Sequence, residues 1–368
     1  MEKQLLDQGQ DLMRICNSCR YCEGFCAVWR AMEYRREFPA SDLNYLSNLC
    51  HDCSECYYAC QYAPPHEWKI NPPLTFARIR TRSYEQYAWP RPLAKAFRAN
   101  GLITALMAAL ACVLFQLGVV LAGNGAALST PVPGGSFYQV TSHGALITVF
   151  SLAAVFALTA LAVGLMSFCR DTGEKLADLF SPANLSLTLK ETLRLEYLDG
   201  GGFGCAYPGE ESSPWRRRFH HLTFYGFLLC FASTTVAAVC DYLLGRPAPY
   251  GCLSLPVVLG ALGGVGLLVG PAGLLTLKWK RNREIVDDSQ VGMDTAFLVL
   301  LLLVSASGLL LLVLRESSAM GTLLVLHLGI VMALFLTMPY GKFVHGLYRF
   351  AAIAKFALER KRKQVLGA

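Results

Sequence analysis

The sequences CNSCRYCEGFC at residues 16–26 and CHDCSECYYAC at residues 50–60 decide how the first part of this 368-residue chain folds. Each contains four cysteines with the spacing C-x2-C-x2-C-x3-C. A cuboidal 4Fe–4S cluster needs a thiolate on each of four irons, and the first three cysteines of such a run reach three of them from one tight loop. The two runs therefore predict two 4Fe–4S clusters.

The fourth cysteine of each run is expected to cross to the other cluster, as it does in two-cluster ferredoxins. The predicted ligands of the first cluster are Cys16, Cys19, Cys22 and Cys60, and those of the second are Cys50, Cys53, Cys56 and Cys26. The alternative is zinc, which C-x2-C pairs also bind. Two complete runs of four suit zinc poorly, because a zinc site takes only four ligands from two separated pairs.

The residues around the cysteines predict helices. The segment 27–49 between the runs is rich in helix formers and shows little strand alternation. We therefore expect residues 1–98 to form an all-helical, ferredoxin-like domain with two clusters. His51 and His66 are interpreted as hydrogen-bonding or surface residues, because the cysteines already complete both clusters.

Residues 99–368 are predicted to form a membrane domain. Six stretches of roughly 20 apolar residues are long enough to span a bilayer, and none contains Asp, Glu, Lys or Arg. They are residues 101–123, 144–168, 222–240, 255–277, 295–314 and 320–341. The fold class is thus all-α, with a six-span, cytochrome b-like bundle. Glycines four residues apart in the fourth span predict close helix packing.

Lysine and arginine predict the orientation of this bundle. Eighteen of them lie in segments 169–221 and 278–293 and in the tail from Lys342, against two in the three opposite loops. Because cytoplasmic loops carry this excess, both termini and the cysteine domain are expected in the cytoplasm of a multi-pass inner-membrane protein. Residues 1–12 have no apolar core, so no signal peptide is expected. These basic residues explain the net charge of +7 through contact with membrane lipids, without a nucleic acid partner.

Histidines in and beside the predicted spans suggest haem. His327 and His345 are five helical turns apart, about 27 Å on one continuous helix, so each is predicted to face one leaflet. His143 would complete an outer haem pair, and His221 or His220 an inner one, since imidazole is a standard axial ligand of haem iron. The alternatives are a single haem b, or interfacial histidines without haem. His327 is the hardest to explain without haem, because ionisable groups within spans are costly.

The cysteine runs, the segment CHDCSECYYACQYAPPHEWKINPP (50–73) and the segment RRRFHHLTFYGFLLCFASTT (216–235) together resemble the tricarballylate/citrate-utilisation protein B family. That family consists of iron–sulfur, b-haem membrane proteins. The resemblance implies a partner, an FAD-dependent tricarballylate dehydrogenase, whose reduced flavin passes electrons through this chain to the quinone pool. The absence of a nucleotide-binding fingerprint and of a catalytic triad agrees with substrate chemistry on another subunit of a two-component oxidoreductase.

Two other functions stay open on the sequence. One is a redox subunit of a disulfide-reducing complex, and the other is a transporter with a redox-sensing cluster domain. Coupled transporters usually keep acidic residues inside their spans, and the six predicted here have none. The segment DGGGFGCAYPGEESSP (199–214) is interpreted as a flexible connector, with docking of a flavoprotein or covering of the clusters as alternatives.

Overall fold

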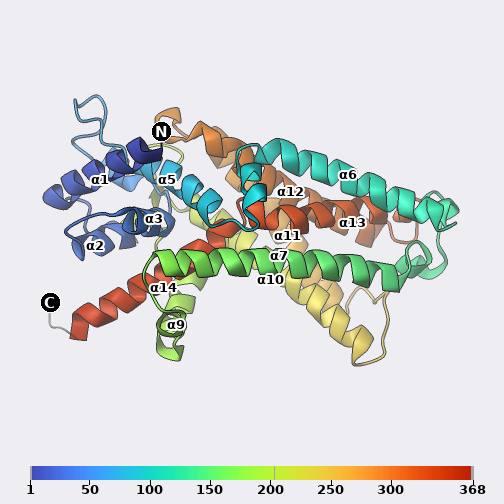
Figure 1. Cartoon of the computed structure of the whole chain (residues 1–368). Coiled ribbons are helices and arrows are strands. Elements are labelled where there is room, and N and C mark those ends of the chain that lie inside the picture. Colours follow the sequence, from blue (N-terminus) through green and yellow to red (C-terminus); the bar gives the residue numbers. More distant parts are fainter. Residues whose placement is uncertain (1, 203, 366–368) are drawn as a thin grey trace.

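The computed structural model describes residues 2–202 and 204–365, and nearly all of them lie in helices or short connections. The described residues contain two strands, β1 (Cys205–Ala206) and β2 (Ser212–Ser213), which pair antiparallel with Cys205 opposite Ser213. The prediction of an all-α protein is confirmed. Figure 1 shows a cysteine-bearing domain at one end of a long helical bundle.

The cysteine-bearing domain is built from helices of different lengths. They are α1 (Glu2–Cys19), α2 (Ala27–Glu33), α3 (Ala40–Leu49), α4 (Glu55–Tyr58), α5 (Pro72–Tyr87) and the 3-10 helix η1 (Arg91–Phe97). Helix α5 begins where the Asn71 side chain accepts a hydrogen bond from the Leu74 amide (3.2 Å), and two prolines occupy its first positions. Both features favour a helix start, because the first amides of a helix lack partners and proline needs none.

Six helices are long and apolar enough to cross a membrane, as predicted. They are α6 (Asn100–Leu121), α7 (His143–Asp171), α10 (Trp215–Tyr242), α11 (Leu255–Trp279), α12 (Asp288–Val313) and α13 (Met320–Thr337). Several extend beyond the predicted apolar stretches. Helix α12 begins at Asp288, so Asp294 lies within it and pairs with Lys278 at the end of α11 and with Lys342.

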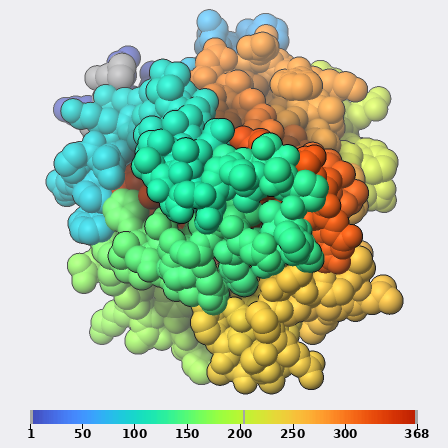
Figure 2. All heavy atoms as spheres, turned by 90° about the vertical axis from the view of Figure 1, so that its right-hand side faces the viewer, coloured from blue at the N-terminus to red at the C-terminus, as the bar shows by residue number. Residues whose placement is uncertain are grey.

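The remaining elements connect these helices. They are η2 (Gly125–Leu128), η3 (Pro133–Gly135), η4 (Phe137–Gln139), α8 (Leu176–Leu179), α9 (Pro182–Leu193), η5 (Gly200–Gly202), η6 (Arg283–Ile285), η7 (Met338–Tyr340) and α14 (Val344–Val365). Figure 2 looks onto the end of the bundle away from the cysteines, where the connections before α7 (green) and between α10 and α11 (yellow) cover the helix ends.

The sixth predicted span is not one continuous helix, which corrects the expected alignment of His327 with His345. Helix α13 ends at Thr337, η7 follows, and Gly341 is extended before α14 starts. Pro339 explains the break, because proline cannot donate the backbone hydrogen bond and clashes with the preceding turn. His327 and His345 therefore lie on different helices, and the five-turn spacing does not apply.

Close packing of the fourth span is confirmed. Helix α11 crosses α10 so closely that a Cβ atom on Gly263 would lie 2.8 Å from both the Cys230 amide nitrogen and the Gly226 carbonyl oxygen. Only glycine leaves room for such a backbone approach. The close packing on α11 fixes the position of α10, which carries His220, relative to the rest of the bundle.

The cysteine domain and the membrane helices share one hydrophobic core. Tyr84 and Tyr87 of α5 pack against Tyr348 of α14, and Phe168 of α7 contacts Tyr87 and Tyr348. Figure 1 shows α9 and α14 beside the cysteine domain, at the same end of the bundle. The lysine- and arginine-rich segments therefore gather where the cysteine domain lies.

Candidate functional site

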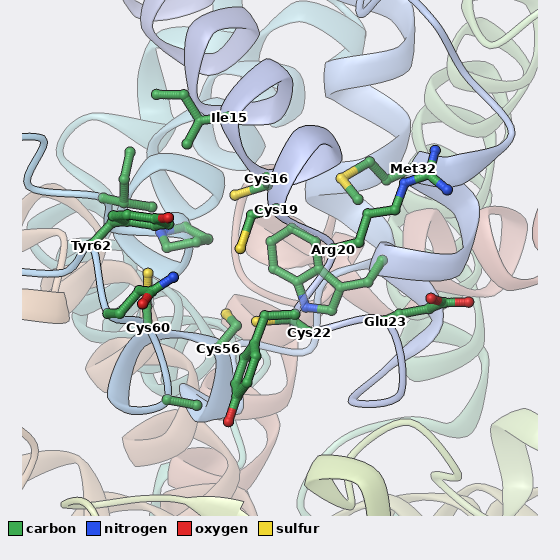
Figure 3. Close-up of a pocket in the computed structure, with 16 residues that line it drawn as sticks. Ile15, Cys16, Cys19, Arg20, Cys22, Glu23, Met32, Cys56, Cys60 and Tyr62 are labelled. Atoms are coloured by element: carbon green, nitrogen blue, oxygen red, sulfur yellow. The ribbon is translucent and has the colours of Figure 1, made fainter.

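The first group of cysteines surrounds a cavity of about 220 Å³. Cys16 and Cys19 lie in the last turn of α1, Cys22 lies in the following turn, and Cys60 comes from the second run. Figure 3 shows their sulfur atoms facing a common space. Burial, followed by the nearby thiols of Cys60 and Cys19, raises the pKa of Cys22 to about 12. The structure thus places Cys60 with the first run, and Cys56 of the second run lines the same cavity.

The second group consists of Cys50, Cys53, Cys56 and Cys26, which line a smaller cavity of about 10 Å³. Cys50 ends α3, Cys56 lies in α4, and Cys26 precedes α2. Burial raises the pKa of the Cys26 thiol well above its usual value, with further contributions from Cys53 and Cys50. Cys26 therefore lies with the second run.

The thiols of each group are not gathered tightly enough to surround a single metal ion. Among residues 2–202 and 204–365, no three His, Cys, Asp or Glu side chains converge as closely as one metal ion requires. Four thiolates around one zinc ion all lie about 2.3 Å from it, whereas a 4Fe–4S cluster spreads them over four irons. The donor set of each group, four cysteine thiols, is that of a 4Fe–4S cluster.

Arginines from three helices and from the connection between α11 and η6 hold the second cysteine loop. Arg80 and Arg349 donate to the Cys50 carbonyl (2.7 and 2.8 Å), and Arg216 donates to the carbonyls of Asp52 and His51 (2.6 and 2.9 Å). Arg281 makes a bidentate ion pair with the Asp52 carboxylate at 2.7 and 2.8 Å. These contacts fasten the second loop to the membrane helices, and the sequence indicated only that these arginines are basic.

The described part of the glycine-rich segment 199–214 is held by specific contacts, which corrects the interpretation of this segment as a flexible connector. Its Ser212 hydroxyl donates to the Glu55 carboxylate at 2.7 Å, and Cys205 packs against Cys53 in a small apolar cluster. The Tyr207 ring lies 4.5 Å from the Arg216 guanidinium and 4.9 Å from that of Arg281. The described part of the segment covers the second cysteine group, which was the alternative interpretation. Cys205 carried no signal of this contact in the sequence.

A larger cavity of about 450 Å³ lies beneath the second loop and contains two of the predicted histidines. The rings of His220, from α10, and His345, from α14, lie edge to face with centres 6.2 Å apart and planes at 74°. The cavity lining is mostly apolar and includes Phe224, Phe227, Leu228, Phe297, Leu301 and Phe343. His220 Nδ1 is buried and makes no hydrogen bond to the described residues.

The two imidazoles lie close enough for both to hold one metal ion, because a nitrogen ligand lies about 2 Å from its ion and the ring centres are 6.2 Å apart. Burial, reinforced by Arg349 and Lys342, lowers the pKa of His345 well below its usual value. This keeps the imidazole neutral, as a metal ligand must be.

The neighbouring His221 faces elsewhere. Its ring lies 5.8 Å from that of Tyr225 and does not line the cavity, so the structure separates the two candidates that the sequence left open. Adjacent helical residues point about 100° apart, and the packing of α10 on α11 decides which of them faces inward.

The predicted outer histidines have different neighbours. His143 Nε2 lies 3.1 Å from the Asp241 carboxylate, and its ring stacks on Tyr242. His327 Nδ1 lies 2.9 Å from the Ser307 hydroxyl on α12. Within the part of the chain that the structure describes, these contacts do not bring His143 and His327 together as a pair.

The fold and the paired thiol groups define a helical membrane protein with an iron–sulfur, electron-transfer role. Comparison with known proteins agrees. The chain belongs to the citrate utilization protein B family: the profile of that family matches residues 95–365, and the profile of its Fer4-like domain matches residues 9–86. The chain is 47% identical over 360 residues to citrate utilization protein B of Escherichia coli, covering 97% of this chain and 93% of that protein. No solved structure shows significant similarity.

Proposed function

We propose that this protein carries electrons from a reduced FAD-dependent dehydrogenase, acting on tricarballylate, through two 4Fe–4S clusters and one b-type haem to a membrane quinone. Clusters and haem supply one-electron steps, which join a two-electron flavin donor to a two-electron quinone acceptor.

One observation carries the proposal: the second cysteine group and the histidine cavity share a wall. His51, which lies between the ligands Cys50 and Cys53, lines the cavity that holds His220 and His345. Arg349 also lines this cavity while it donates to the Cys50 carbonyl. A carrier bound by the cysteines would therefore border a carrier bound by the histidines.

The charges of the cavity suit haem b. Its charged lining consists of four cations (Arg216, Lys278, Lys342 and Arg349) and two carboxylates (Glu191 and Asp294). Lys278 and Lys342 share the single Asp294 carboxylate, so these three side chains retain one positive charge that a haem propionate would balance, since buried charges are stable only when they are paired. His220 and His345 would hold the iron, and the phenylalanines would enclose the ring. This arrangement favours a single haem over the two-haem alternative.

Orientation supports a donor in the cytoplasm. The basic segments lie at the same end as the cysteine domain, and cytoplasmic segments carry the excess of lysine and arginine. The first cysteine group is the more exposed of the two, with Cys19 on the surface, so a soluble dehydrogenase reaches it most directly.

The test combines composition with adjacent histidine variants. We expect about eight non-haem irons and one haem b per chain, and reduction of quinone when tricarballylate and its dehydrogenase are added to membranes. His220→Ala should remove the b-type absorbance and quinone reduction, while His221→Ala should retain both. Zinc in place of iron, or full haem content in His220→Ala, would contradict the proposal.

A further inference from the structure

The two cysteine groups differ sharply in their electrostatic surroundings. The charged side chains that line the first cavity are Arg20 and Glu23, which carry opposite charges and are both exposed to solvent. The lining therefore contributes no net charge to the first cysteine group. Because Arg20 and Glu23 are exposed, water and salt also screen their individual charges.

The second group lies among cations. Arg80, Arg216 and Arg349 donate hydrogen bonds to backbone carbonyls of residues 50–52, and Arg281 pairs with Asp52. Asp52 and Glu55 are the acidic side chains of this loop, so the four arginines leave it with a net positive charge.

Three of these arginines have no carboxylate partner. Among the described residues, no ion pair joins Arg80, Arg216 or Arg349 to an acidic side chain, although Arg80 is 3% exposed and the other two are only partly exposed. An unpaired buried cation is costly. A 4Fe–4S cluster with four thiolates is anionic and supplies the missing counter-charge.

These cations also affect electron affinity. Reduction adds one negative charge to a cluster, and nearby positive charges stabilise the reduced form most strongly where the dielectric constant is low. Burial acts in the opposite direction, because it disfavours the more highly charged state. At the second group three unpaired guanidiniums oppose that burial effect, whereas the first group has no comparable cations.

We propose that the second cysteine group holds the cluster with the higher reduction potential, and that Arg80, Arg216 and Arg349 set this order. The inference rests on the proposed function, since it assumes both clusters. One electron then leaves the reduced first cluster, which is reoxidised, and reduces the second, which borders the histidine cavity. The fixed charges of these arginines thus direct electrons from the first cluster to the second, toward the histidine cavity.

Redox titration of the purified full-length protein, followed by electron paramagnetic resonance, tests this order. Cys26→Ser identifies the signal of the second cluster. In the unmodified protein the second cluster should be reduced first. Arg216→Gln should lower the midpoint potential of the second cluster and leave that of the first cluster unchanged. Arg216→Lys, which keeps the positive charge, should have a second-cluster potential close to that of the unmodified protein.

Arg217→Gln is the matched control, because Arg217 is adjacent on α10 but contacts Asp199 and the Arg194 carbonyl instead. It should shift neither potential. If Arg216→Gln does not fold, Arg349→Gln replaces it. Equal or reversed potentials in the unmodified protein, or an Arg216→Gln shift of both clusters or of neither, would overturn this inference. Absence of iron–sulfur clusters would instead overturn the proposed function.

Discussion

Replacing Asp52 with asparagine should loosen the second cysteine loop from the membrane helices. Asp52 has a left-handed backbone (φ 59°), which asparagine also tolerates, so the substitution removes the charge without adding backbone strain. It breaks the bidentate contact with Arg281, whose side chain is 6% exposed against 17% for that of Asp52. The neutral amide would accept at most one hydrogen bond from Arg281, which also keeps its contacts with Ser54 and the Tyr207 ring.

The magnitude follows from the geometry. With N–O distances of 2.7 and 2.8 Å the charge centres lie about 4 Å apart, where an effective dielectric constant of about 20 gives about 4 kcal/mol. Removing one partner of a buried pair typically costs about 3–5 kcal/mol. For a domain of about 100 residues, each kcal/mol lowers the midpoint of thermal unfolding by at least about 4 °C. We therefore expect Asp52→Asn to lower the midpoint of thermal unfolding by about 12 °C or more.

Thermal bleaching of the iron–sulfur absorbance, together with proteolysis of the cysteine domain, would measure this loss. Asp11→Asn is the control, because it breaks the Asp11–Arg14 pair, in which both side chains are more than 60% exposed. Asp11→Asn should lower the free energy of unfolding by less than about 1 kcal/mol. A double-mutant cycle with Arg281→Met should show strong coupling to Asp52→Asn. If Asp52→Asn costs no more than Asp11→Asn, the pair does not hold the loop.

Three further predictions test other parts of the structure. Cys60→Ser should remove the first cluster selectively and Cys26→Ser the second, as resolved by electron paramagnetic resonance; selective loss in the uncrossed order would reject the ligand assignment. His345→Ala should abolish the b-type absorbance, and retention of full haem would exclude His345 as a ligand. Gly329→Ala should cost about 1–3 kcal/mol of stability in thermal unfolding, because its Cβ would lie 2.6 Å from the α6 backbone; Gly118→Ala, with open space around it, should cost far less.

The histidines show where sequence reasoning reached its limit. The spacing of His327 and His345 predicted one straight helix, but Pro339 ends α13 and places His345 on α14. The proline was visible in the sequence and is a known helix breaker. The choice of His220 over His221 had no such signal, because both residues belong to the same turn of α10.

The second-loop arginines were visible only as basic residues that predict orientation. Arg349 reaches the Cys50 carbonyl across 299 residues of sequence, and Arg216 reaches the His51 carbonyl across 165. Cys205 likewise contacts Cys53 only because β1 packs beside α4. No local periodicity connects residues so far apart along the chain.

The sequence by itself determined the two thiol groups, the six apolar helices and the all-α fold class. These depend on short-range spacing: cysteines a few residues apart share a loop, and an uninterrupted apolar stretch of about 20 residues makes a spanning helix. Tertiary structure alone decided that His220 lies beside His345, that the described part of residues 199–214 covers the second cysteine group, and that four arginines contact the loop of that group. Such contacts join distant segments, and packing between helices, rather than the pattern along any one of them, selects which side chains meet.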